Sequence, residues 1–142
     1  MSSIISIVIF VAIIVVAIFL YRRRRRPRTL DKIYFMKKWK ELQKLCADKS
    51  TWSQAIVSAD SLLDEALKKK RLGGKSMGER LVKAQRVLTD NDGVWFGHKL
   101  HNKIDAEPKF NVKEADVKTA LLGIRQALKD LGALPSDQPR NS

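Results

Sequence analysis

The chain has 142 residues, and its 28 Lys and Arg outnumber 15 Asp and Glu, which gives a formal net charge of +13. Beyond an apolar N-terminal run, roughly a hundred residues remain, which is enough for one small domain and excludes two. Cys46 is the single cysteine, which excludes an internal disulfide and a thiolate metal cluster and agrees with a reducing cytoplasm. The positive charge leaves nucleic acid, anionic lipid and acidic protein as compatible partners.

The apolar run extends from Ile4 to Tyr21, and Ser6 is its only polar side chain. At about 1.5 Å per residue, the run spans roughly 27 Å as a helix, close to a bilayer core of about 30 Å. We therefore expect residues 1–21 to form a transmembrane helix with a short extracytoplasmic N-terminus. A cleaved signal peptide is the less favoured alternative, because its positive charge would precede the apolar run.

A polybasic juxtamembrane linker follows at residues 22–28. Its arginines are Arg22, Arg23, Arg24, Arg25, Arg26 and Arg28. Short basic flanks stay on the cytoplasmic side, so we expect a single-pass protein of the inner (cytoplasmic) membrane, with the N-terminus outside and the C-terminal domain in the cytoplasm. A further hypothesis is that the arginines bind anionic headgroups, at about 1 kcal/mol each. The extended linker reaches at most about 25 Å, which would hold the domain at the membrane surface.

Residues 29–134 show apolar residues at helical spacing and no convincing strand pattern. They predict an all-α fold, a cytoplasmic bundle of four to five short helices, followed by a disordered tail at 135–142. The first helix is expected over 29–47 with Thr29 as its N-cap, and its apolar residues include Ile33. The second helix is expected to start at Ser50 or Thr51 and to stop at Gly73-Gly74.

The second helix has the clearest amphipathic pattern in the sequence. Its apolar residues are Trp52, Ala55, Ile56, Ala59, Leu62, Leu63, Ala66 and Leu67. Its polar face is expected to carry Gln54, Ser58, Asp60, Asp64, Glu65 and Lys68. The two aspartates, at positions i and i+4, are interpreted as a solvated face or as partners of arginines in the bundle. The run at its end, Lys68, Lys69, Lys70 and Arg71, usually stabilises a helix terminus, and the sharper hypothesis is an anion or RNA patch.

Three further helices are predicted. Ser76 to Glu79 has the form of a capping box and starts the third helix. That helix is expected to have a core stripe and an outer face, formed by Leu81, Ala84, Val87 and Leu88 and by Arg80, Lys83 and Arg86 respectively. An aspartate of the turn at 90–93 caps a fourth helix over roughly 94–105, and Asn111 caps the last one, which ends at Gly132.

The fourth helix has two faces that both look buried. Phe96, Leu100 and Ile104 form one, and Trp95, His98, His101, Asn102 and Asp105 form the other. The spacing of His98, His101 and Asp105 is compatible with three metal ligands, but no cysteine or further histidine supplies a fourth. The sequence therefore predicts no metal and no cofactor, and it favours a buried His98 that is bonded to a neighbouring helix.

The motifs Gly78-Glu79-Arg80-Leu81 and Gly97-His98-Lys99-Leu100-His101-Asn102-Lys103-Ile104, together with Trp52, Trp95 and Glu107, resemble a group of small bacterial membrane-anchored proteins. Their soluble domain is similar to the HEPN superfamily of helical domains, and the resemblance covers nearly all of residues 29–134. In HEPN ribonucleases, an arginine and a histidine five residues later form an RNA-cleaving site across a dimer. The resemblance implies a HEPN-like bundle and a possible homodimer.

The motif helix, which carries His98, His101, Asn102, Asp105 and Glu107, departs from that pattern. Aligned on Asn102, the arginine position holds His101 and the histidine position holds Ala106, which has no proton to give or take. The sequence therefore predicts a membrane-anchored, non-catalytic binding or assembly module. Its expected partners are the lipid bilayer and an unknown protein or a second copy. The alternative is a membrane-tethered RNA-binding protein or degenerate HEPN-type ribonuclease.

Overall fold

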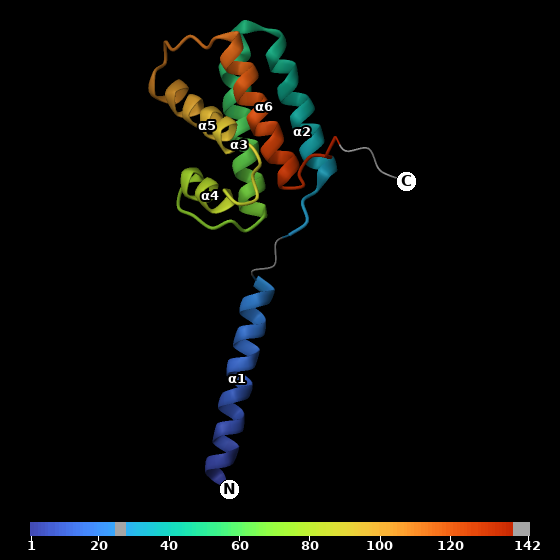
Figure 1. Ribbon diagram of the computed structural model, residues 1–142, viewed down its shortest axis with the longest axis vertical. Helices are drawn as coiled ribbons and strands as arrows, with labels where there is room; N and C mark the ends of the chain where they lie inside the picture. Colours follow the sequence, from blue (N-terminus) through green and yellow to red (C-terminus); the bar gives the residue numbers. More distant parts are fainter. Residues whose placement is uncertain (25–27, 138–142) are drawn as a thin grey trace.

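The computed structural model describes residues 1–24 and 28–137, and this part of the chain is all-helical, with no strand. The N-terminal helix α1 (Ser2–Arg24) stands apart from a bundle that contains α2 (Lys32–Lys44), α3 (Trp52–Lys69), α4 (Met77–Ala84), α5 (Asn91–Ala106) and α6 (Glu114–Asp130) (Figure 1). The predicted fold class is confirmed at this level: an apolar N-terminal helix followed by a helical bundle.

Helix α1 has no buried residue, and it is long and apolar enough to cross a membrane. A signal sequence near an N-terminus meets the same test. The Ser6 hydroxyl donates to the carbonyl of Ser2 over 3.0 Å, so the one polar side chain of the run is satisfied within the helix. The helix continues through Arg24, beyond the predicted end at Tyr21, and Arg25 and Arg26 lie outside the described residues.

Helix α2 begins later than predicted. Asp31 is its N-cap, because its carboxylate accepts hydrogen bonds from the backbone amides of Ile33 and Tyr34, so the prediction of Thr29 was wrong. Ile33 is 82% exposed and lies outside the core, whereas Phe35 and Trp39 are buried. Two short 3₁₀ turns, Leu45–Ala47 and Lys49–Thr51, connect α2 to α3.

The apolar stripe of α3 is confirmed from Ala55 to Leu67, and Trp52 is half-buried. The helix ends before the predicted glycines. Arg71 has a φ of 60°, its amide donates to the carbonyl of Lys68, and the amide of Leu72 donates to that of Leu67. These bonds form the Schellman closure that Gly73-Gly74 was expected to provide, here with an arginine in the left-handed position.

The remaining helix ends follow the predicted pattern in part. The Ser76 hydroxyl accepts from the Glu79 amide, as in a capping box, but the Glu79 carboxylate accepts from the Lys75 amide instead of that of Ser76. Asp90 caps α5, whereas α6 has Lys113 at its N-cap without a side-chain bond, so the prediction of Asn111 was wrong. Gly132 closes α6 with a φ of 79°, as expected.

Three side chains predicted from periodicity lie elsewhere. Val87 is 55% exposed because α4 ends at Ala84, and Phe96 is 37% exposed on α5. Arg80, which was expected on an outer face, is buried.

Close backbone contact fixes α5 against α6. A Cβ added to Gly123 of α6 would lie 2.3 Å from the carbonyl carbon of Gly93 in the first turn of α5. One added to Gly97 would lie 3.0 Å from the Cδ1 of Ile124. The absence of these side chains lets the two helices approach closely, and this contact holds α5 where its histidines meet α3.

Candidate functional site

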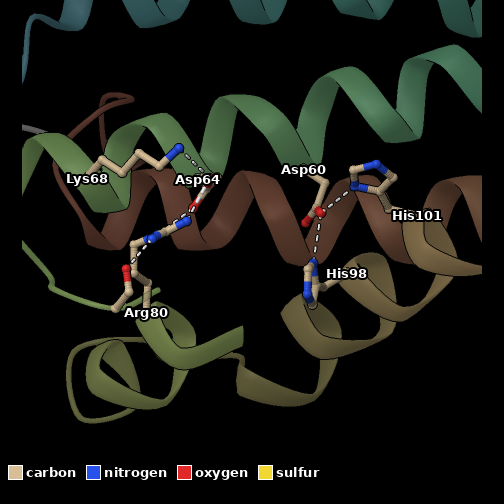
Figure 2. Close-up of polar contacts among 7 residues, drawn as sticks. Asp60, Asp64, Lys68, Arg80, His98 and His101 are labelled. Carbon is tan, nitrogen blue, oxygen red and sulfur yellow. Dashed lines mark hydrogen bonds and ion pairs between the residues drawn. The ribbon is translucent and has the colours of Figure 1, made fainter. Parts of the chain in front are cut away.

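The most deeply buried polar side chain of the bundle is Asp60 of α3, which is 0% exposed. Its Oδ2 atom lies 2.9 Å from Nδ1 of His98 and 2.6 Å from Nδ1 of His101, both on α5 (Figure 2). Asp60 had been expected on a solvated face. It lies four residues after Ile56 and three before Leu63, so it belongs to the edge of the apolar stripe that packs against α5.

The two histidines reach Asp60 because α5 presents them on one face. They are three residues apart, and the neighbouring Gly97 and Leu100 are buried. The ring of Trp95 meets that of His98 edge to face, with 5.9 Å between the centroids. The prediction that His98 bonds to a group on a neighbouring helix is therefore confirmed.

The hydrogen bond to Asp60 raises the pKa of His98, and its partial burial acts in the opposite direction. The second ring nitrogen of His101, Nε2, lies 3.0 Å from Oδ2 of Asp105. His101 thus stands between two carboxylates. Asp60 Oδ1 is buried and has no hydrogen-bond partner among the described residues.

A second polar cluster lies one turn further along α3. The Arg80 guanidinium donates to both oxygens of Asp64, over 2.7 and 3.1 Å, and to the carbonyl of Gly74 over 2.7 Å. Lys68 Nζ lies 3.1 Å from Asp64 Oδ2. Burial would raise the pKa of Asp64, but the hydrogen bonds from Arg80 and Lys68 outweigh it and lower that pKa. This cluster is a closed ion-pair network. The sequence allowed an arginine partner for both aspartates, and the structure gives one to Asp64, whereas Asp60 meets histidines.

A cavity of about 370 Å³ opens between the two clusters. Its lining includes Asp60, Asp64, Lys68, His98 and His101. The cavity lies over the contact of α3 with α5, and acidic, basic and imidazole side chains all contribute to its lining.

The other predicted site residues lie apart from this cavity. Asn102 and Glu107 are exposed on and just after α5, and Arg22 to Arg24 continue α1. Within the basic run, Lys69 Nζ lies 3.1 Å from Glu65 Oε1, so two of its lysines are paired on their own helix.

Three side chains from two helices meet the requirements of a metal-binding set: Asp60, His98 and His101 each offer a ligand atom, and these atoms lie within 4.8 Å of one another. The sequence suggested Asp105 as the carboxylate, whereas the structure brings Asp60 instead. Comparison with protein-family models, with curated proteins and with solved structures gave no match. The function is therefore argued from the geometry of this chain.

Proposed function

We propose that the chain is a single-pass protein of the cytoplasmic membrane whose helical domain is a non-catalytic binding or assembly module at the inner surface. Two features of α1 support the membrane anchor: its apolar side chains are all exposed, and its C-terminal end carries Arg22, Arg23 and Arg24. Arginines at one end of a span favour the cytoplasm for that end. The chain would then have its N-terminus outside and residues 28–137 inside.

The observation that carries the proposal is the position of the basic run at the end of α3. The hydroxyl of Tyr34, in the first turn of α2, donates to Glu65 Oε2, and Lys69 Nζ lies 4.5 Å from the centre of the Tyr34 ring. The end of α3 therefore lies beside the start of α2, where the chain arrives from α1 (Figure 1). The guanidinium of Arg71 also donates to the carbonyl of Arg24.

This position favours anionic lipid as the ligand of the basic run. The run Lys68, Lys69, Lys70 and Arg71 ends α3 at the end of the bundle that faces α1 (Figure 1), and its Arg71 bonds to Arg24 of α1. Basic side chains near an anionic surface contribute about 1 kcal/mol each. Together, the two basic segments would hold the domain against the headgroups and leave its other faces for a protein partner or a second copy.

The surroundings of His101 support a non-catalytic role. In a HEPN-like arrangement, which we retain as a proposal, the two catalytic positions are His101 and Ala106. Both ring nitrogens of His101 lie at bonding distance from carboxylates, and Ala106 has no group that exchanges protons. RNA binding through the basic run is the alternative, and it depends on the same four side chains.

A vesicle experiment tests the proposal. The fragment from Thr29 onward suits it, because no residue of α1 belongs to either hydrophobic core cluster. We expect it to co-sediment with vesicles containing anionic lipid and not with neutral ones. Replacing Lys68, Lys69, Lys70 and Arg71 with Ala should lower this binding at least tenfold.

The matched control removes the same charge elsewhere, by replacing Lys99, Lys109, Lys113 and Lys118 with Ala, and should keep most of the binding. A parallel capture from lysate, with and without nuclease, distinguishes the lipid-surface hypothesis from the RNA-binding one. Nuclease-sensitive RNA that depends on the α3 run, without vesicle binding, would replace the lipid-surface proposal by the RNA-binding one.

A further inference from the structure

Each of the two ring nitrogens of His101 faces a carboxylate oxygen. Its Nδ1 faces Asp60 Oδ2 at 2.6 Å and its Nε2 faces Asp105 Oδ2 at 3.0 Å. Ionised carboxylates only accept hydrogen bonds, and a neutral imidazole has only one N–H. With both carboxylates ionised, one of the two contacts therefore needs an added positive charge: either a second proton on His101, or a cation between Nδ1 and Asp60.

The Asp60 carboxylate also lacks a fixed positive partner among the described residues. The side chain is 0% exposed, and its Oδ1 has no partner among the described residues. Within residues 1–24 and 28–137, no lysine or arginine forms an ion pair with Asp60, although Arg80 and Lys68 both pair with Asp64 one turn away. Buried carboxylates are normally paired with charges or coordinate a metal.

We propose that Asp60, His98 and His101 bind a divalent transition-metal ion of the Zn²⁺ type, which joins α3 to α5. The ligand atoms would be a carboxylate oxygen of Asp60 and Nδ1 of both histidines, which face the same point (Figure 2). Two imidazoles and a carboxylate are a ligand set that suits Zn²⁺ and not Mg²⁺. The inference does not depend on the role proposed above.

Metal binding needs an adjustment of the three ligand atoms, which lie within 4.8 Å of one another. Ligand atoms bound at about 2.0 to 2.1 Å around a tetrahedral ion lie roughly 3.3 Å apart, so the contacts of 2.6 and 2.9 Å must open by about half an ångström. Metal binding would remove the Nδ1 protons, and the Nε2–H of His101 would donate to Asp105. Asp60 would then have the ion as its partner, and Asp105 would have an N–H donor. A fourth coordination position would remain for a water on the cavity side.

The test is calorimetric titration of the full chain in neutral detergent at pH 7.5, with any affinity tag removed and with Cys46→Ser to exclude the thiol. We expect one Zn²⁺ per chain, a higher unfolding temperature with Zn²⁺ than with a chelator, and no heat with Mg²⁺. His98→Ala and Asp60→Asn should lower the affinity at least a hundredfold. Asp105→Asn should lower it about tenfold, because Asp105 only orients His101.

Lys99→Ala, an exposed neighbour on α5, is the matched control and should bind as the parent chain does. Helical circular dichroism checks that each variant is folded. A folded parent chain that shows no heat and no change of unfolding temperature with Zn²⁺ would overturn the proposal. Equal binding by the parent chain and a folded Asp60→Asn or His98→Ala variant would overturn it as well.

Discussion

Two aspartates of α3, four residues apart, have different kinds of partners in the rest of the bundle. Asp64 receives a bidentate guanidinium from Arg80 and an ammonium from Lys68, so fixed positive charge surrounds it. Asp60 is more deeply buried, yet among residues 1–24 and 28–137 its polar partners are two imidazoles and no lysine or arginine. Burial alone therefore does not determine the role of a carboxylate. Among the described residues, the Asp64 cluster has its own fixed cations, whereas the Asp60 cluster has none.

Removing the guanidinium of Arg80 should have the largest effect on stability. Arg80→Ala leaves Asp64 with Lys68 as its one cationic partner among the described residues, and breaking a buried ion pair on one side costs about 3 kcal/mol. Urea unfolding of the fragment from Thr29 onward measures this. Arg86→Ala, which removes an exposed arginine just after α4, should change stability by less than about 0.5 kcal/mol. Equal effects of the two substitutions would mean that the Asp64 cluster is not structural.

A methyl group on Gly123 should damage the Asp60 cluster and leave the Asp64 cluster intact. The new Cβ would collide with the backbone of Gly93, so α5 must move away from α6 and carry its two histidines with it. Overpacking of this kind costs about 2 kcal/mol. Gly78→Ala is the control, because its Cβ would meet the Trp95 ring at an ordinary 3.7 Å.

Histidine NMR resonances and urea unfolding together read out the Gly123 substitution. We expect both histidine signals to shift in Gly123→Ala and to stay in place in Gly78→Ala. Unchanged histidine signals in a destabilised Gly123→Ala protein would show that α5 does not position the site.

The two aspartates can be compared directly by replacing each with asparagine in the presence of a chelator. Asp64→Asn leaves the buried Arg80 without its anion and should cost about 2 kcal/mol. Asp60→Asn keeps an acceptor for the histidines and removes a charge without a fixed partner, so it should cost about 1 kcal/mol. Urea unfolding at pH 7 decides the order, and the reverse order would contradict the distinction between the clusters.

Acid should weaken the Asp64 cluster, with the smallest effect of the four. The pKa of Asp64 is lowered in the folded chain, because hydrogen bonds from Arg80 and Lys68 outweigh burial. Its contribution is therefore complete above the unfolded pKa of about 3.9 and is lost as the pH falls through the folded pKa. The free energy of unfolding should fall less steeply in Asp64→Asn than in the parent chain between pH 5 and pH 3. Parallel curves would mean that Asp64 has the same pKa in both states.

The sequence predicted the helices well because their signals are local. Apolar periodicity located α3, and the Ser76 cap and Gly132 marked ends that the structure shares. The end of α3 was missed because a Schellman closure can take a residue other than glycine, here Arg71. The shift of the first cap from Thr29 to Asp31 reflects a choice between two suitable residues close in sequence.

The site was only half predictable. The spacing of His98 and His101 placed both on one face of a helix, but their shared partner lies 38 and 41 residues earlier in the chain. Nothing local identifies such a partner. One signal was available: Asp60 falls between Ile56 and Leu63 at core spacing, and an aspartate in that position needs a buried counterpart. Arg80, four residues before the predicted core residue Ala84, gave a similar signal.

The burial of Leu30 limits how far the helical domain can move from α1. Leu30 is 5% exposed and packs into the main core cluster, so residues 25–29 alone separate the end of α1 from the bundle. Even fully extended, they reach at most about 18 Å. With α1 in a bilayer, a partner in the same membrane would meet the domain in a thin layer, at a high effective concentration. An interface of weak intrinsic affinity would then be enough for assembly, and the same interface would stay dissociated in bulk solution.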